Sequence, residues 1–280
     1  MGQQGIFYIV ATPIGNLDDI SQRALKILQE VDVIAAEDTR HTRKLLDAYQ
    51  ISTKMVSLHE HNETERAQML IDKMLAGDNV ALVSDAGTPL ISDPGYVIVN
   101  QARQQSIQVV PIPGACAAIA ALSAGGLPTD RFLFAGFLPQ KSGPRQQSVA
   151  ELMKQAATTV LYESPRRIID LLEAIQAVDA QRSVCLAKEL TKSFERFLPG
   201  TPGELIEVLQ QDPDLQRGEW VVLIAPPEKQ RESSLGAEIL EAVEIAADAL
   251  PLKKACEVVA KITGHKKNQL YQAVLEYREK

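Results

Sequence analysis

The residues best suited to hold a small molecule are glycines and prolines in three short loops. The loops read ATPIGN at 11–16, SDAGTPLISDPG at 84–95 and PIPGACA at 111–117. Glycine lets a backbone approach a ligand closely, and proline fixes the shape of a loop. Asp85 adds a carboxylate that can accept hydrogen bonds from a hydroxylated or cationic ligand. One such loop would be an ordinary tight turn, but three of them predict a ligand site.

Several familiar binding and catalytic motifs are missing from the chain. There is no GxGxxG, no GxxxxGK[ST] and no GxSxG, so a standard dinucleotide fold, a P-loop and a nucleophile elbow are not supported. The three cysteines, Cys116, Cys185 and Cys256, lie far apart and form no CxxC. We expect reduced thiols in a reducing compartment and no metal site.

The loops must be positioned by the elements around them. Apolar strand-like runs at 6–10, 31–36, 54–59, 79–83 and 108–112 alternate with helical patterns such as 63–76 and 95–105. This order predicts an α/β domain with a parallel sheet covered on both faces. The three loops then follow the first, fourth and fifth strands, at the sheet edge where such folds bind ligands.

The pattern restarts after Gly125 and Gly126. Strands at 132–138, 159–162, 183–187 and 220–225 alternate with helices, including 146–157. We predict an N-terminal α/β domain at 1–125, a second α/β domain at 126–228 and a helical, partly basic tail at 229–280. In the tail, Leu252, Ala255, Val259 and Ile262 form one face of a short helix before the turn at 263–266. A second short helix follows this turn. The two helices resemble a helix-turn-helix, but they could equally be a helical hairpin that packs against the α/β domains.

Seven motifs in one order identify a family. They are ATPIGN (11–16), AAEDTR (35–40), SDAGTPLISDPG (84–95), PIPGACA (111–117), YESPRR (162–167), AKELTK (187–192) and GEWVVLI (218–224). The set resembles the tetrapyrrole-methylase-type (class III) S-adenosylmethionine-dependent methyltransferases, and within them the ribosomal RNA small subunit methyltransferase I branch. That branch methylates the ribose 2′-hydroxyl of a decoding-region cytidine in 16S rRNA. Tetrapyrrole-modifying members usually carry GxGPG-like and GDP-type loops where this chain has ATPIGN and SDAGTP, so a porphyrinoid substrate is disfavoured.

The resemblance implies two α/β domains with S-adenosylmethionine in the cleft between them, and a homodimer. It also implies which residues contact the cofactor: Pro13, Ser84, Asp85, Ala86, Gly87, Thr88, Ala115, Cys116, Ala117, Leu161, Tyr162, Leu190, Ala225 and Pro226. Positions 91–95 are interpreted as the turn and helix start that hold the loop in place.

A ribose hydroxyl is a poor nucleophile until its proton is accepted. We expect Glu189, or the pair His59 and His61, to orient this hydroxyl. The histidines could instead satisfy their own turn, and Glu189 could belong to an ion pair.

RNA binding requires cations that reach phosphates. The candidates are Lys141, Arg145, Arg166, Arg167, Lys266 and Lys267. The net charge of −7 over 280 residues means that such contacts must be local patches. The expected partner is small-subunit rRNA, within the 30S particle.

With 45% hydrophobic residues, no signal-like N-terminus and no apolar run of membrane length, we expect a cytoplasmic enzyme without a membrane partner. Two other functions stay open at this point. One is a methyltransferase of a tetrapyrrole or other metabolite, and the other is a non-catalytic nucleic-acid-binding protein.

Overall fold

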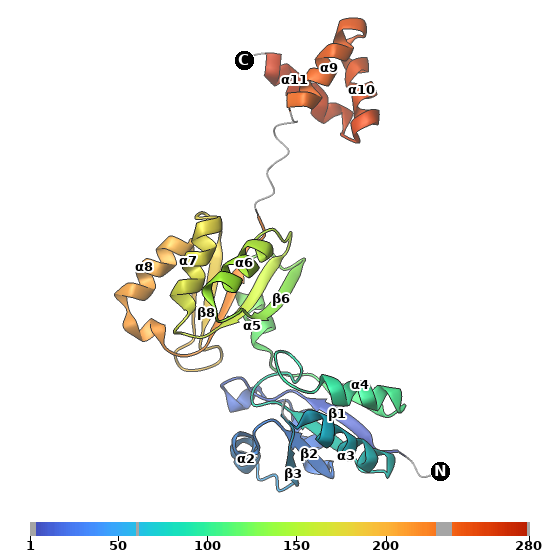
Figure 1. The fold of residues 1–280 in the computed structure, drawn as a ribbon, viewed down its shortest axis with the longest axis vertical. Helices are drawn as coiled ribbons and strands as arrows, with labels where there is room; N and C mark the ends of the chain where they lie inside the picture. The colour runs from blue at the N-terminus through green and yellow to red at the C-terminus, as the bar shows by residue number, and fades with distance from the viewer. Residues whose placement is uncertain (1–3, 60–61, 228–236, 279–280) are drawn as a thin grey trace. The chain divides into compact units, whose positions relative to one another are not determined.

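The chain separates into two compact units. The computed structural model describes residues 4–59, 62–227 and 237–278. The units are Met1–Pro227 and Glu228–Lys280. The first carries two five-stranded sheets, and the described part of the second consists of helices (Figure 1). Two α/β sheets followed by a helical tail are the predicted fold class, which is confirmed.

The first sheet is entirely parallel and has the order β3-β2-β4-β1-β5. Its strands are β1 Ile6–Val10, β2 Val33–Ala36, β3 Met55–Ser57, β4 Val80–Val83 and β5 Gln108–Ile112. The sequences VIAA of β2 and VALV of β4 are buried at every position. Continuous apolar runs are typical of parallel strands because helices cover both faces of such a sheet.

Helices cover the first sheet on both faces. They are α1 Gln22–Glu30, α2 Thr39–Ala48, α3 Glu63–Leu75 and α4 Tyr96–Gln104, with a short 3-10 helix at Leu17–Asp19. The helices α3 and α4 pack in one apolar cluster, and α1 and α2 pack in another. The helix α2 was not predicted from the sequence. Asp38 begins it by accepting a hydrogen bond from the N–H of Arg40, which is the structural role of this part of the AAEDTR motif.

The second sheet is mixed and has the order β6-β7-β10-β8-β9. Its strands are β6 Phe132–Phe137, β7 Thr158–Glu163, β8 Val184–Lys188, β9 Arg196–Gly200 and β10 Trp220–Ile224. Among the neighbouring strands of this sheet, β6 and β7 pair in parallel, whereas β10 is antiparallel to β7 and β8, and β9 is antiparallel to β8. The sequence analysis missed β9. The connection from β8 to β9 is too short for the crossover that a parallel pair requires.

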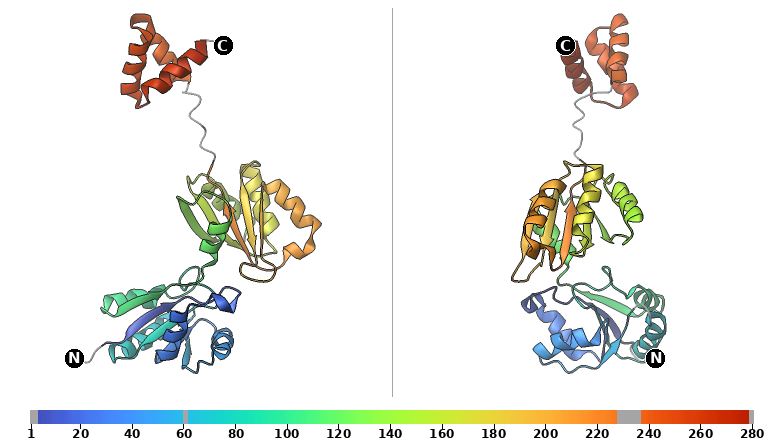
Figure 2. Two further views of the ribbon diagram at one scale, coloured as in Figure 1. Left: turned by 180° about the vertical axis from the view of Figure 1, so that it is seen from behind. Right: turned by 60° about the vertical axis from the view of Figure 1, so that its left-hand side comes forward.

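The two faces of the second sheet are covered differently. The helices α6 Ser142–Leu152, α7 Ile168–Val178 and α8 Pro202–Gln211 pack on one face, and a 3-10 helix at Pro213–Gln216 follows them. The other face is covered by α5, Ala117–Ala124, whose Ala118, Ala121 and Leu122 pack with Val160 and Leu223 (Figures 1 and 2). The boundary predicted at Gly125 therefore does not follow the packing, because α5 belongs to the second core.

The second unit has its own small core. Its helices are α9 Ala237–Ala249, α10 Leu252–Thr263 and α11 Lys267–Arg278. Val243, Cys256, Val259, Leu270 and Val274 are buried between them. Gly264 ends α10 in the left-handed conformation, with φ of 76°, as is common after helices. Ile262, predicted to share one helix face with Leu252, Ala255 and Val259, does not share the burial of Ala255 and Val259, because its side chain is 77% exposed.

Candidate functional site

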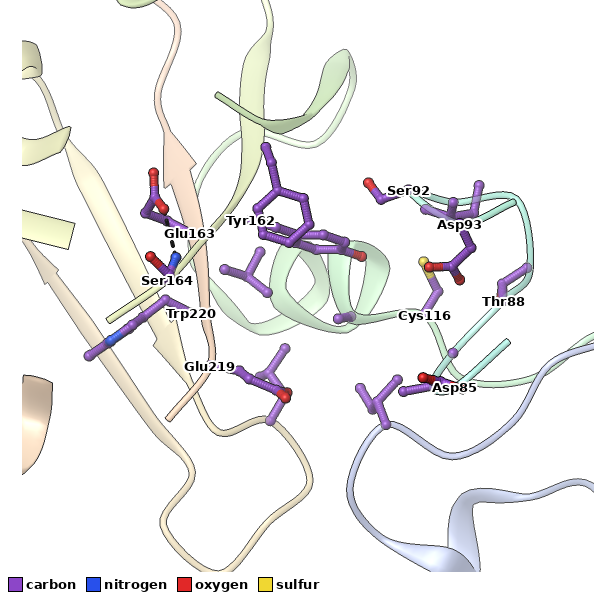
Figure 3. Close-up of a pocket in the computed structure, with 18 of the residues that line it drawn as sticks. Asp85, Thr88, Ser92, Asp93, Cys116, Tyr162, Glu163, Ser164, Glu219 and Trp220 are labelled. Carbon is purple, nitrogen blue, oxygen red and sulfur yellow. Dashed lines mark hydrogen bonds between the residues drawn. The ribbon is translucent and has the colours of Figure 1, made fainter. Parts of the chain in front are cut away.

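A cavity of about 450 Å³ lies between the two sheets of the first unit, and we call it the cleft pocket. Its volume is within the usual range for small-molecule sites. One wall comes from the loops after β1, β4 and β5, and the other comes from β6, β7, β10 and the segment after β8. Figure 3 shows the two walls facing each other, with Asp85, Thr88 and Asp93 opposite Glu163, Glu219 and Trp220.

The three glycine- and proline-rich loops are joined by hydrogen bonds. The N–H of Thr12 donates to the carbonyl of Gly87 at 2.8 Å, and the N–H of Gly87 donates to the carbonyl of Thr12 at 3.1 Å. The hydroxyl of Thr88 donates to the carbonyl of Ala115 at 3.0 Å. The structure thus brings loops from three separate parts of the sequence into one wall, as was predicted from their place after the strands.

The second half of the 84–95 loop also reaches the cavity. Leu90 and Ser92 have φ of 72° and 68°, a left-handed conformation that is uncommon outside glycine. Ile91, Ser92 and Asp93 line the cleft pocket. The interpretation of this segment as only a turn and helix start is thus too narrow. Gly95 does fit it, since it is the N-cap of α4 and its N–H donates to the carboxylate of Glu63, the first residue of α3.

Two carboxylates stand on this wall. Oδ1 of Asp85 accepts a hydrogen bond from the N–H of Asp38 at 3.0 Å. Asp93 is half-buried, and its burial raises the pKa of its carboxyl group, to which the charge of Asp85 adds. A hydrogen bond from Ser84 acts in the opposite direction. The environment of Asp93 therefore favours its protonated form more than water does.

The opposite wall is aromatic. Phe134 and Phe137 pack edge-on against Tyr162, with ring centroids 5.0 and 5.6 Å away. The hydroxyl of Tyr162 accepts a hydrogen bond from the N–H of Ala118 in the first turn of α5 at 3.2 Å. Burial raises the pKa of Tyr162 to about 12, so that this phenol stays neutral at physiological pH. In Figure 3 the carboxylate of Asp93 and the thiol of Cys116 lie on the side of this hydroxyl.

A buried ion pair supports the inner end of the cavity. The carboxylate of Glu163 is inaccessible to solvent and accepts hydrogen bonds from the guanidinium of Arg167 and the N–H of Ser164, each at 2.7 Å (Figure 3 draws the latter). Arg167, expected to contact RNA, is thus occupied inside the protein. Arg145 is similarly buried in α6, where its guanidinium lies 2.8 Å from Asp170. The RNA contact expected for Arg145 is therefore wrong, because this residue lies in α6, which begins at Ser142, and its side chain is turned into the protein.

Glu189 lies outside the lining of the cleft pocket. Its Oε1 accepts hydrogen bonds from the N–H of Glu219 at 2.8 Å and from the ammonium of Lys192 at 3.1 Å. Burial alone would raise its pKa, but these two hydrogen bonds and the Lys192 charge leave the pKa of Glu189 lowered. A carboxylate held in this way is a weak proton acceptor. The geometry therefore supports the ion-pair alternative for Glu189, with Lys192 as its partner.

The two walls touch where ATPIGN meets AKELTK. The N–H of Asn16 donates to the hydroxyl of Thr191 at 3.1 Å. Gly15 packs so closely that an added Cβ would lie 2.5 Å from Cγ of Lys192 and 3.1 Å from the carbonyl oxygen of Leu190. The ATPIGN and AKELTK motifs thus contact each other beside the pocket. Their nearest ends, Asn16 and Ala187, are 171 positions apart in the sequence.

The remaining predicted site residues are distributed unevenly. Those that line the cleft pocket are Asp85, Ala86, Gly87, Thr88, Cys116, Ala117, Tyr162 and Leu190. Ser84 and Leu161 are buried and do not line it. Pro13 is not in the lining, and Ala225 and Pro226 follow the far end of β10, whose first residues Trp220 and Val221 line the pocket.

The expected histidines and the remaining cations lie elsewhere. His59 is in a turn, where its N–H donates to Oδ1 of Asn62 at 2.9 Å, and His61 is outside the described residues. Lys141, Arg166 and Lys266 are exposed, whereas Lys267 pairs with Glu257 at 3.3 Å. Across residues 4–59, 62–227 and 237–278 there is no cluster of ligating side chains that would suit a metal ion. In the same segments no helix has the length and apolarity of a membrane span.

Comparisons with known proteins agree with this geometry. The family described as Tetrapyrrole (Corrin/Porphyrin) Methylases matches residues 7–206, and the RsmI C-terminal HTH domain matches residues 233–278. Proteins named ribosomal RNA small subunit methyltransferase I from Pasteurella multocida and Vibrio cholerae are 50% and 52% identical to this chain. The alignments cover 98% of both proteins in the first case, and 97% of this chain and 94% of the relative in the second.

Solved structures show the same fold at low sequence identity. Uroporphyrin-III-C-methyltransferase from Thermus thermophilus has a TM-score of 0.56 and 19% identity, covering 79% of this chain and 94% of its own. Diphthine synthase has a TM-score of 0.59 and 16% identity, covering 79% and 90%. The two-sheet fold, the cleft and these matches show that the chain belongs to the tetrapyrrole methylase family, among the ribosomal RNA small subunit methyltransferases I.

Proposed function

We propose that this protein transfers the methyl group of S-adenosyl-L-methionine to the 2′-hydroxyl of a cytidine ribose in the decoding region of 16S rRNA, within the 30S particle in the cytoplasm. The observation that carries this proposal is the cleft pocket, formed by loop backbone on one side and aromatic side chains on the other. The relatives that align over nearly the whole chain are named for methylation of small-subunit rRNA.

The cleft pocket suits this cofactor. A uroporphyrin-III C-methyltransferase of the same fold, with a TM-score of 0.54 and 17% identity, was solved with S-adenosyl homocysteine. Here the wall at 85–88 offers small residues and backbone groups, and α5 begins at the pocket, where the N–H of Ala118 donates to Tyr162 but the N-cap residue Cys116 provides no side-chain cap for the other N–H groups of the first turn. Such N–H groups favour an anionic group, such as an amino acid carboxylate. Asp85 provides the acceptor for hydroxyl or ammonium donors.

When bound, the cofactor supplies an electrophilic methyl group. The contribution of the chain is then to position the acceptor hydroxyl, exclude water and receive a proton. Leu190, Val221 and Phe137 make the cavity largely apolar, which keeps water away from the reacting groups.

Asp93 is the residue best placed to receive the proton from the 2′-hydroxyl. It lines the cleft, its carboxylate stands across from Tyr162, and burial gives it a higher proton affinity than an exposed aspartate has. Glu189 and His59, the acceptors expected from sequence, are hydrogen-bonded to other protein groups and do not line this cavity. We therefore assign the role to Asp93.

RNA contact would come from exposed cations of both units. Lys141 and Arg166 belong to the first unit, and Lys266 belongs to the turn before α11 in the second. Each is solvent-exposed, so its charge is available to a phosphate at little desolvation cost. We propose in addition that the protein is a homodimer, which sedimentation equilibrium of the purified protein would test.

The decisive experiment is transfer of a radiolabelled methyl group from S-adenosylmethionine to purified 30S particles, free 16S rRNA and tRNA. Nucleoside mass spectrometry of the labelled RNA then locates the methyl group. We expect label in 30S particles, in a 2′-O-methylcytidine, and loss of that label with Asp93→Asn. Absence of label from all three RNAs would contradict the proposed function, and label on a base would contradict the 2′-hydroxyl as acceptor.

A further inference from the structure

A second cavity, of about 400 Å³, adjoins the cleft pocket, and we call it the side pocket. It is formed by the end of β8, the segment that follows, the start of β9 and the residues just before β10. Lys188, Phe194, Arg196, Leu215, Arg217 and Gly218 contribute to its lining. No step of the proposed methyl transfer uses this cavity.

The two cavities are separated by a single stretch of backbone. Gly218 lines both of them and has φ of 84°. A Cβ at this position would lie 2.5 Å from Oε1 of Glu189, so only glycine fits without displacing that carboxylate. Glu219 lines the cleft pocket, whereas Glu189 lines the side pocket. A polymer bound with one residue in the cleft pocket therefore has its neighbouring residue within reach of the side pocket.

The floor of the side pocket carries a buried ammonium group. Lys188 is only 7% exposed, and its Nζ donates to the carbonyl of Asp214 at 2.7 Å and lies 5.9 Å from the ring centroid of Trp220. An ammonium group has three donors, and this is its one hydrogen bond within the described part of the chain. A buried lysine with donors to spare favours a ligand that brings acceptor oxygen or nitrogen atoms.

The rim offers flat surfaces. Phe194 is 72% exposed, so the face of its phenyl ring is open to a binding partner. The guanidinium groups of Arg196 and Arg217 are also exposed, and they lie 3.9 Å from Asp212 and 3.3 Å from Asp214. Phenyl rings and guanidinium planes are the groups on which unpaired bases of RNA stack.

The charges around the side pocket indicate whether it binds the base or the phosphate of a nucleotide. Three cations, Lys188, Arg196 and Arg217, face three carboxylates, those of Glu189, Asp212 and Asp214. This balance does not favour a phosphate, whose binding requires an excess of cations. A neutral, planar ring with carbonyl oxygens can accept a hydrogen bond from Lys188 and can stack on Phe194 or on the guanidinium groups at the rim.

We infer that the side pocket binds the base of a nucleotide adjacent to the methylated one, stacked on Phe194 and hydrogen-bonded to Lys188. This inference rests on the proposed function, because it requires an RNA chain whose acceptor ribose lies in the cleft pocket. It adds a means by which the enzyme selects its target through a flanking base.

Phe194→Ala tests the stacking contact. Its side chain is exposed, so the variant should fold, which its Tm verifies. We expect KM for 30S particles to rise on the order of tenfold, as for the loss of one stacked base, with kcat and the Kd for S-adenosylmethionine unchanged. Phe194→Trp should retain the wild-type KM. The matched control is Phe132→Ala, which removes another exposed phenyl group from β6, outside both cavities.

A second measurement identifies the base. Reconstituted 30S particles with a single abasic nucleotide on either side of the methylated position are assayed with wild type and with Phe194→Ala. We expect one abasic position to raise KM for the wild type and to have no further effect on the variant. Additive effects at both positions, or a wild-type KM for Phe194→Ala, would overturn the inference while leaving the proposed function standing. Absence of methyl transfer to RNA by the wild-type enzyme would overturn both.

Discussion

The contact between Gly15 and the segment 190–192 predicts a specific loss of cofactor affinity in Gly15→Ala. Gly15 is not among the positive-φ residues, so alanine is compatible with its backbone, and the effect comes from contact alone. The new methyl group would meet Cγ of Lys192 at 2.5 Å, the hydroxyl of Thr191 at 2.9 Å and the carbonyl oxygen of Leu190 at 3.1 Å. The lysine side chain can rotate away, but the backbone oxygen cannot.

The size of the expected rise in Kd depends on how much of the strain is carried by the free protein and how much by the bound protein. Overpacking by one methyl group costs about 1–3 kcal/mol. The free protein relieves this strain if the two walls separate, which sacrifices the hydrogen bond between Asn16 and Thr191, about 1 kcal/mol. Binding of S-adenosylmethionine needs both walls, so the bound state carries the strain. Three contacts of 3.1 Å or less place the strain in the upper part of this range, about 2–3 kcal/mol. The bound state then carries about 1–2 kcal/mol more than the relaxed free protein, so the Kd should rise about 5- to 30-fold, since each 1.4 kcal/mol is a factor of ten.

Isothermal titration calorimetry measures the Kd, and urea denaturation measures the free energy of unfolding. Gly143→Ala is the matched control, because its Cβ would meet no atom within 4 Å and it lies in α6. This control should leave the Kd unchanged and stabilise the helix by up to about 1 kcal/mol. A Kd for Gly15→Ala within a factor of two of wild type would show that strain in the contact between Gly15 and residues 190–192 does not affect the cofactor site.

Three further predictions concern the proton acceptor, the buried ion pair and the RNA surface. Burial raises the pKa of Asp93, and only its ionised form accepts a proton, so single-turnover methylation should decline as the pH falls through that raised value. Asp93→Asn should be about 10²- to 10⁴-fold slower and lack this decline; a variant with the wild-type pH profile would exclude the role. Arg167→Met leaves the buried Glu163 carboxylate unpaired and should lower the free energy of unfolding by about 3–5 kcal/mol. Exposed Arg166→Met should change that free energy by less than about 0.5 kcal/mol in the same urea titration, and equal losses would contradict the assignment. Replacing Lys141 and Arg166 by alanine should weaken binding to 16S rRNA and reduce the slope of log K against log salt by about one unit per lost phosphate contact, whereas an unchanged slope would place the RNA elsewhere.

The sequence was sufficient to predict the first sheet and the loops that form one wall of the site. Short apolar runs bounded by glycine and proline mark β1, β4 and β5, and the loops after them meet because parallel strands end at a common edge. Asp85 and Gly87 were accordingly expected at the pocket, and they line it.

Features that depend on long-range packing were not predictable. The helix α5 is apolar on all sides, so its pattern could not show which sheet it covers. Asp93 reaches the cleft because Leu90 and Ser92 adopt the left-handed backbone conformation. A single sequence does not reveal that a leucine or a serine will adopt it. Arg145 reads as a surface cation because its partner Asp170 lies 25 positions away, and only the packing of α6 beside α7 joins them.

The location of α5 determines where this chain can be divided. A fragment that ended at Gly125 would carry the apolar surface of Ala118, Ala121 and Leu122 without the strands that bury it, and its complement would lack one cover of its sheet. Both pieces would therefore be prone to aggregate. A division at Pro113 and Gly114, just before α5, keeps each hydrophobic core with its own polypeptide. An exchange of domains between relatives at this position would keep both hydrophobic cores, but Cys116 and Ala117 of the first wall of the cleft would come with the second domain.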